Sequence, residues 1–127
     1  VLGTIKDIQK IKNEDIYFAI GIGNNKIRRE IYEKYKVNYY TAIHPTAVIA
    51  IDTTIGEGTA IAANTVINVS TQIGKCCIIN TGTIVEHDCT LQNFVHLSTG
   101  VIVNSNTTIE QTTYIESGNN IKINGLK

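Results

Sequence analysis

The sequence lacks a net charge, since eleven Lys and Arg residues balance eleven Asp and Glu residues. A neutral chain gives no argument for binding to nucleic acid or to an anionic membrane surface. The sequence also has no apolar run near the ~20 residues of a membrane span, and no signal peptide is visible. We therefore expect neither a nucleic-acid partner nor membrane insertion.

The sequence has no CxxC pair, and its cysteines are odd in number: Cys76, Cys77 and Cys89. This pattern does not support a disulfide framework. We expect Cys77 and Cys89 to be buried and reduced, with a reactive thiol as the alternative. A reducing cytoplasm fits this usage.

The chain does not begin with Met, and Val1-Leu2-Gly3-Thr4 resembles the middle of a domain, so we expect a segment upstream. Its charge is uneven. Residues 1–40 hold eight Lys and Arg against five acids, net +3, and the remainder holds three against six, net −3. The asymmetry predicts two parts, residues 1–40 and 41–127.

An aliphatic residue occupies every sixth position across the second part. A period of six does not fit a helix, whose apolar period is 3.6, and it extends further than a single strand. Short fixed repeats predict stacked coils, and hexapeptide repeats predict a parallel β-helix. The column is Ile43, Ile49, Ile55, Ile61, Ile67, Ile73, Ile79, Val85, Leu91, Leu97, Val103, Ile109, Ile115 and Ile121.

The neighbours of this column predict how each coil is built. With the aliphatic residue as position i, position i−2 is small or β-branched, as at Thr59 and Cys77, and shares its face of the strand. Position i+1 is often Gly or Asn, as at Gly74 and Asn80. We expect i+1 to be the corner position with positive φ.

The first forty residues predict a βα unit. Residues 16–20 are an apolar strand candidate, residues 21–25 (GIGNN) form a turn, and residues 26–36 form a helix with one apolar face. Such turns bind phosphates through backbone N–H groups, but the motif alone is weak and we favour plain turn chemistry. Arg28 and Arg29 either meet phosphates or lie on a solvated helix face, and we favour the solvated face.

The cluster Glu86-His87-Asp88 interrupts the nearly uncharged repeat. Histidine is the usual general base near neutral pH, and an adjacent carboxylate can orient it. Asp88 can do so only if a corner turns its side chain toward the ring. His87 is therefore either a catalytic base or a solvent-facing histidine. We expect His44 to be structural, because it precedes Pro45 where the repeat begins, and the histidine spacings do not indicate a metal site.

Two stretches, residues 80–89 (NTGTIVEHDC) and 94–100 (FVHLSTG), resemble the hexapeptide-repeat acetyltransferases of the sialic acid O-acetyltransferase group. That group includes bacterial N-acetyltransferases of UDP-linked 4-amino sugars. Residues 19–21 (AIG), 24–28 (NNKIR) and 43–47 (IHPTA) agree. The resemblance covers nearly the whole chain. It implies a mainly β protein, a left-handed parallel β-helix with three hexapeptides per coil, preceded by the remnant of a small α/β (Rossmann-like) nucleotide-sugar-binding domain.

The resemblance also implies an activity: transfer of acetyl from acetyl-CoA to an amino or hydroxyl group of a sugar or nucleotide-linked sugar. No metal is expected, and members are homotrimers with acetyl-CoA between adjacent β-helices. His87 would be the general base, and Asp88 would enhance its basicity. The other implied residues are His96, Asn80, Gly100 and the backbone at Ser105 for acetyl-CoA, and Gly21 and Gly23 for the nucleotide sugar.

A coil of eighteen residues places His87 and His96 half a coil apart. If both serve one site, they come from different subunits. The family's opening strand and further C-terminal coils are absent from this sequence, which indicates part of a longer protein or a degenerate version. Two other functions stay open, a metal-dependent hydratase on the same fold and a non-catalytic scaffold.

Overall fold

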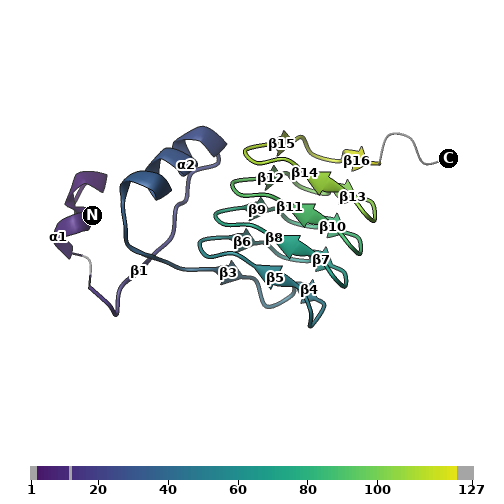
Figure 1. Ribbon diagram of the computed structural model, residues 1–127, viewed down its shortest axis with the longest axis horizontal. Coiled ribbons are helices and arrows are strands. Elements are labelled where there is room, and N and C mark those ends of the chain that lie inside the picture. Colours follow the sequence, from purple (N-terminus) through teal and green to yellow (C-terminus); the bar gives the residue numbers. More distant parts are fainter. Residues whose placement is uncertain (1–2, 12, 123–127) are drawn as a thin grey trace.

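The computed structural model describes residues 3–11 and 13–122 and consists of a β-helix with a small helical part at one side (Figure 1). The β-helix has three parallel sheets, and each of its strands is two residues long. Sheet I contains β3 (Ala42–Ile43), β6 (Ala60–Ile61), β9 (Ile78–Ile79), β12 (His96–Leu97) and β15 (Tyr114–Ile115). Sheet II contains β4 (Val48–Ile49), β7 (Val66–Ile67), β10 (Ile84–Val85), β13 (Ile102–Val103) and β16 (Asn120–Ile121). Sheet III contains β5 (Thr54–Ile55), β8 (Gln72–Ile73), β11 (Thr90–Leu91) and β14 (Thr108–Ile109).

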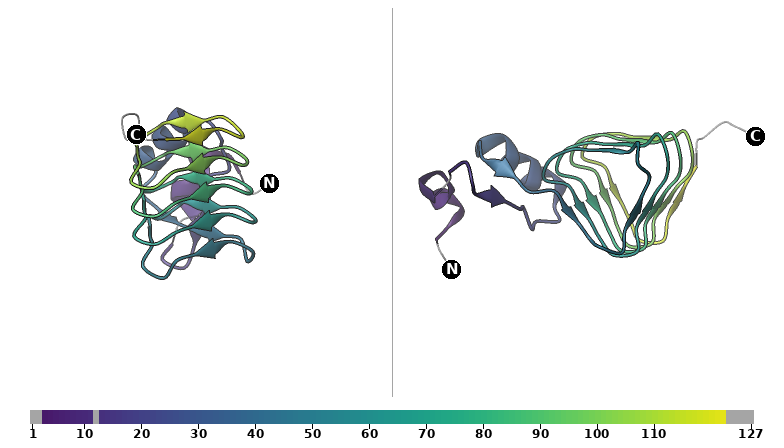
Figure 2. Two further views of the ribbon diagram at one scale, coloured as in Figure 1. Left: turned by 90° about the vertical axis from the view of Figure 1, so that its right-hand side faces the viewer. Right: turned by 90° about the horizontal axis from the view of Figure 1, so that it is seen from below.

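The strands pair in a register of eighteen residues, so that each coil is three hexapeptides. Ile61 pairs with Ile79, and Leu97 pairs with Ile115. Viewed along the axis, the coils superimpose as a triangle with three corners (Figure 2). The predicted left-handed parallel β-helix is confirmed. We name the corners by the sheets they join: I–II, II–III and III–I.

The aliphatic column fills the interior. Most of its members are buried, and Ile79, Val85 and Leu97 are completely so. Burying such a side chain contributes about 1.5–3 kcal/mol. The exceptions lie in the first and last coils, which are covered by a neighbouring coil on one side only: Ile43 is exposed, and Ile49, Ile55 and Ile121 are partly exposed.

The i−2 residues are buried as predicted, and they also make hydrogen bonds. The hydroxyl of Thr59 donates to the carbonyl of Gly74 at 2.8 Å, fifteen residues ahead. Cys77 and Cys89 donate their thiols to carbonyls at the same offset. Both thiols are therefore buried, unpaired core groups that replace a Thr hydroxyl.

The prediction that position i+1 has positive φ is wrong. Positive φ falls at i+3 in every hexapeptide from Gly58 onward. Gly74, at i+1, is small for another reason: a Cβ there would lie 2.6 Å from Oδ1 of Asn93 on the next coil. Close packing between coils, rather than a left-handed backbone, explains such glycines. The residues with positive φ are Gly58, Asn64, Ser70, Cys76, Gly82, Asp88, Phe94, Gly100, Asn106, Thr112 and Gly118.

The first forty residues form the expected βα unit with shorter elements. A 3-10 helix, η1 (Ile5–Asp7), and α1 (Ile8–Ile11) precede β1 (Tyr17–Phe18), which pairs in parallel with β2 (Asn38–Tyr39). Between them lies α2 (Asn25–Lys34), and Asn24 caps it by accepting from the N–H of Ile27 at 3.1 Å. None of the described helices is long and apolar enough to cross a membrane.

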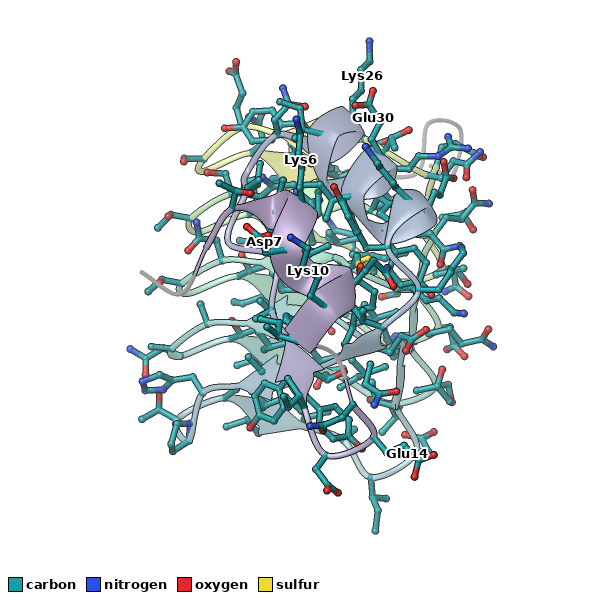
Figure 3. The ribbon with its side chains drawn as sticks, turned by 90° about the vertical axis from the view of Figure 1, so that its left-hand side faces the viewer. Lys6, Asp7, Lys10, Glu14, Lys26 and Glu30 are labelled. Atoms are coloured by element: carbon teal, nitrogen blue, oxygen red, sulfur yellow. The ribbon has the colours of Figure 1, made fainter. Side chains whose placement is uncertain are left out.

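The helix α2 packs on the III–I corner of the β-helix. The Tyr32 hydroxyl donates to Glu57 at 2.6 Å, and the Tyr32 ring contacts the ring of Phe94 edge-on, with 5.6 Å between centroids. The outer side of this end carries charged groups, including Lys26 and Glu30 of α2 (Figure 3). The III–I corner is thus covered, whereas none of the helices in residues 3–11 and 13–122 lies over the I–II or II–III corner (Figure 2).

Candidate functional site

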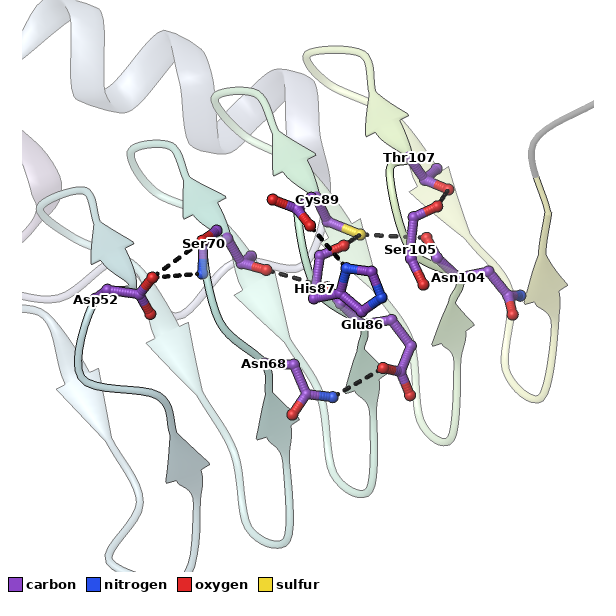
Figure 4. A network of polar contacts seen from close by, with 11 residues as sticks. Asp52, Asn68, Ser70, Glu86, His87, Cys89, Asn104, Ser105 and Thr107 are labelled. Atoms are coloured by element: carbon purple, nitrogen blue, oxygen red, sulfur yellow. Dashed lines mark hydrogen bonds and ion pairs between the residues drawn. The ribbon is translucent and has the colours of Figure 1, made fainter.

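His87 and Asp88 form a hydrogen-bonded pair at the II–III corner. Figure 4 shows His87 and its labelled polar neighbours at this corner. Asp88 has a φ of 57°, and this left-handed turn brings its Oδ2 to 2.7 Å from Nδ1 of His87. A carboxylate oxygen only accepts, so Nδ1 carries the proton and Nε2 keeps its lone pair. The side chains are 48% and 53% exposed, so Nε2 is accessible to a reactant from outside the β-helix.

The corner that carries the pair is held by the preceding coil. The hydroxyl of Thr71 donates to the carbonyl of Glu86, and the amide of Asn68 donates to its carboxylate, both at 3.0 Å. The backbone N–H of Asp88 donates to the carbonyl of Val69. These hydrogen bonds hold the backbone of the corner in place, so the position of the His87 imidazole is fixed, as a catalytic group requires.

The predicted acetyl-CoA residues lie at two corners and on one face. Ser105 is one coil beyond His87, and the N–H of the residue after it, Asn106, donates to the His87 carbonyl at 3.0 Å. Asn80 and Gly100 lie at the I–II corner instead. Within one chain, the structure brings only Ser105 to the His87–Asp88 pair.

His96 projects from the outer face of sheet I beside the turn of residues 21–25, here called the glycine turn. Its Nδ1 lies 3.1 Å from the carbonyl oxygen of Gly23. A carbonyl only accepts, so Nδ1 is protonated and Nε2 is the acceptor. Nε2 is buried and has no hydrogen-bond partner among the described residues, and the Tyr114 ring packs edge-on at 5.0 Å. Burial lowers the pKa of His96, which favours the neutral ring.

A groove of about 470 Å³ runs along this contact. Gly23 is in its wall, whereas Gly21 lies outside it, and a Cβ at Gly21 would have no neighbour within 4 Å. The structure therefore connects one of the two predicted substrate-binding glycines with His96. The lining residues are Gly23, Asn24, Asn25, Lys26, His96, Thr112 and Tyr114.

The prediction that Arg28 lies on a solvated helix face is wrong, because the side chain is only 1% exposed. The side chains of α2 that contact the β-helix are Asn25, Arg28 and Tyr32, whereas Ile27, the start of the predicted apolar row, is exposed. The spacing of three and four between these polar and aromatic residues was the signal in the sequence. The Arg29 side chain is 42% exposed and pairs with Glu33 at 2.7 Å, as a partly solvated face predicts.

His44 is tied into its own turn. Its Nδ1 accepts from the N–H of Thr46 at 3.2 Å and lies 2.9 Å from the Thr46 hydroxyl, which agrees with the structural role predicted for it. Across the described part of the chain, no three His, Cys, Asp or Glu side chains come together in a group that could hold a metal ion.

Comparisons with known proteins agree with this arrangement. Residues 1–35 match the family described as the PglD N-terminal domain. The UDP-N-acetylbacillosamine N-acetyltransferase of Bacillus subtilis (strain 168) is 40% identical over 48 residues, which is 35% of this chain and 22% of that protein.

Solved structures match nearly the whole chain. The acetyltransferase domain of PglB from Neisseria gonorrhoeae FA1090, in complex with acetyl coenzyme A, has a TM-score of 0.88 and 31% identity over 94% of this chain and 60% of that one. A mutant of GDP-perosamine N-acetyltransferase from Caulobacter crescentus, in complex with CoA and GDP-perosamine, has a TM-score of 0.75 and 26% identity over 93% of this chain and 65% of that one.

The chain thus spans 22% to 65% of the length of these relatives. The six-residue period and the β-helix with its preceding βα unit agree with these comparisons. Both parts of the chain are similar to hexapeptide-repeat sugar acetyltransferases.

Proposed function

We propose that the protein transfers acetyl from acetyl-CoA to the amino group of a nucleotide-linked amino sugar. The observation that carries the proposal is the His87–Asp88 contact of 2.7 Å, which leaves an accessible Nε2 lone pair on a fold shared with acetyltransferases. Among the relatives, one is named for UDP-N-acetylbacillosamine and another is bound to GDP-perosamine, so a nucleotide-linked amine is favoured over a hydroxyl acceptor.

In the proposed reaction the acceptor nitrogen attacks the thioester carbonyl carbon while Nε2 of His87 removes a proton from that nitrogen. A C–N bond forms, the C–S bond breaks, and the proton held by His87 passes to the departing thiolate. Asp88 holds Nδ1–H, so that the ring keeps its base nitrogen outward and the transient imidazolium is stabilised. A positioned base of this kind contributes about 10²–10⁴-fold.

The donor site proposed here lies between chains. His87 with Ser105, Asn80 with Gly100, and His96 occupy three separate places around one β-helix. A single acetyl-CoA molecule contacts all three groups only if neighbouring subunits contribute different groups. We therefore propose a homotrimer in which the donor lies between adjacent β-helices.

The outer surface of sheet II supports this assembly. Its outward residues Val48, Val66, Ile84 and Ile102 stack in one column through the strand pairing. The corresponding column of sheet III is polar: Thr54, Gln72, Thr90 and Thr108. An aliphatic face of this kind favours contact with another subunit. Ile84 is only three residues from His87, which would place the base at the edge of that contact.

For the acceptor, we propose that residues 1–40 are part of an α/β substrate-binding domain and that Gly21 and Gly23 line its nucleotide-sugar pocket. The match of residues 1–35 to the PglD N-terminal domain supports this division. We propose residues 41–127 as the β-helix domain. We place the reaction in the cytoplasm, since all three cysteines are unpaired thiols.

The alternatives considered from the sequence have less support. No relative described above is a hydratase, and the paired, accessible His87 and Asp88 are not needed for a scaffold.

The test is acetyl transfer measured by mass spectrometry of the sugar, with acetyl-CoA and UDP- or GDP-linked 4-amino sugars as substrates. The assay uses this chain. We expect His87→Ala to lose about 10²–10⁴-fold in kcat. His44→Ala, which removes another corner histidine, should keep its activity. Near-normal turnover by His87→Ala contradicts the base assignment, and a wild type with no transfer to any of these acceptors contradicts the function.

A further inference from the structure

Arg28 is a buried guanidinium whose N–H donors all meet oxygen atoms. Arginine has five such donors, and each one has an acceptor here. None of the acceptors is a carboxylate, so the charge is held by oriented dipoles. The acceptors are the carbonyls of Ile22 and Gly23 at 3.0 Å from Nη1, Cys76 at 2.7 Å from Nε, Phe94 at 3.0 Å from Nη2, and the Asn25 side chain at 2.9 Å from Nη2.

These contacts fasten the glycine turn to the III–I corner. Cys76 and Phe94 are one coil apart and both have positive φ, which is unfavourable for residues with a Cβ. Thr112, one coil further, shares this conformation, and its carbonyl accepts from the Asn25 amide at 3.0 Å. One helix turn therefore binds the carbonyls of three successive coils.

The carbonyl of Gly23 is shared. One contact is Nη1 of Arg28 at 3.0 Å, and the other is Nδ1 of His96 at 3.1 Å. A carbonyl oxygen has two lone pairs, so it accepts both hydrogens at once. Its position is set by Arg28, which is itself anchored to the β-helix.

We propose that Arg28 is a positioning residue for His96, acting through the Gly23 carbonyl. By holding that carbonyl against Nδ1, Arg28 keeps the proton on Nδ1 and the lone pair on Nε2, because the partner of one ring nitrogen determines the tautomer. Nε2 of His96 is then only an acceptor. It is buried in this structure, so a ligand N–H or O–H reaches it only after a neighbouring side chain moves.

This role rests on the proposed function only for the identity of the ligand, which is the acetyl donor with its amide N–H groups. The tautomer itself is a property of the free protein. The two parts can therefore be tested apart, one without substrate and one with it.

The first test is NMR of the wild type and of Arg28→Lys labelled with ¹⁵N-histidine, since protonated and unprotonated ring nitrogens have distinct shifts. The His96 signals are assigned with His96→Gln. We expect the wild type to show His96 protonated at Nδ1 alone. Lysine has no planar fork and replaces at most some of the five bonds, so Arg28→Lys should lose this preference and show a mixture of tautomers.

Tyr32→Phe is the matched control. It removes the α2 contact to Glu57, as Arg28→Lys removes others, but it leaves Gly23 and His96 untouched. If weaker packing of α2 were the only cause, the tautomer populations of His96 would change equally in both variants. We expect the tautomer of His96 to change only in Arg28→Lys.

The second test is kinetics at saturating acceptor. We expect Arg28→Lys to raise KM for acetyl-CoA by about tenfold, the effect of about one hydrogen bond, with a smaller change in kcat. Tyr32→Phe should match the wild type. A wild-type His96 protonated at Nε2, or an unchanged tautomer in Arg28→Lys, overturns the proposal even if Arg28→Lys is poorly active. If the wild type transfers no acetyl, the proposed function fails while the NMR result still decides the role of Arg28.

Discussion

Nδ1 of His87 lies 2.7 Å from Oδ2 of Asp88, although the two residues are adjacent in the chain. In an extended strand, neighbouring side chains point to opposite faces. The contact exists because Asp88 occupies the i+3 corner position, where φ is positive in each coil from Gly58 to Gly118. The fold therefore supplies a histidine–carboxylate pair from two consecutive residues.

Removing the carboxylate while keeping the corner should lower activity without unfolding the protein. Asp88→Gly suits a φ of 57° and deletes the acceptor of Nδ1–H. We expect kcat/KM to fall about 10- to 100-fold, the effect of a hydrogen bond to a charged group. The control is Asn106→Gly, the equivalent corner one coil on, with a φ of 58°. Equal losses in both variants would show that the carboxylate has no special role.

The inward thiols should tolerate threonine and not a larger side chain. Cys77 and Cys89 donate to carbonyls fifteen residues ahead, as Thr59 does. We expect Cys89→Thr to stay within about 1 kcal/mol of the wild type in free energy of unfolding. Cys89→Leu should lose about 1–3 kcal/mol by overpacking the corner. Urea unfolding measures both, and a Leu variant as stable as the Thr variant would contradict the tight packing.

The aliphatic face of sheet II should carry the subunit contact. Val66 points outward from β7 between Val48 and Ile84, so Val66→Lys would place a charge in the interface. We expect that variant to dissociate in light scattering and to lose acetyl transfer, with its circular dichroism unchanged. Gln72→Lys, an outward position of sheet III, should remain a trimer. A monomeric wild type, or a trimeric Val66→Lys, would exclude this face as the interface.

Stability should depend on pH through His96. Burial lowers its pKa from the ordinary value of 6.5, so the unfolded chain binds the proton more tightly than the folded chain. The contribution of His96 is therefore complete above pH 6.5. It is lost as pH falls from 6.5 through the lowered pKa of the folded state. Thermal unfolding of His96→Gln should show a smaller loss of stability over this range than the wild type.

The control for that measurement is His44→Gln, which removes a histidine from the I–II corner. Like His96→Gln, this variant removes one titrating imidazole from the unfolded chain, so it corrects for that effect on the pH dependence of stability. If His96→Gln and the wild type show the same dependence on pH, His96 is not protected from protonation in the way its burial indicates.

The sequence alone determined the β-helix, the inward residues and the II–III corner cluster. The six-residue pattern is local, and within each repeat it distinguishes the inward from the outward positions. The pattern alone was therefore sufficient to predict the β-helix. It did not reveal which corner residue is left-handed. Gly and Asn at i+1 suggested that position, but they reflect close packing between coils, as at Gly74.

Only the tertiary structure decided the surroundings of Arg28 and His96. Their contacts join residues separated by 48 and 73 positions, Arg28 with Cys76 and His96 with Gly23. These contacts depend on where α2 lies against the III–I corner. A charged residue on a helix is usually solvated. Arg28 is buried because two corner carbonyls of the β-helix, together with three acceptors in and just before α2, meet all five of its donors. Repetition along the chain specified the coils, whereas the docking of a non-repeating segment specified the groove beside His96.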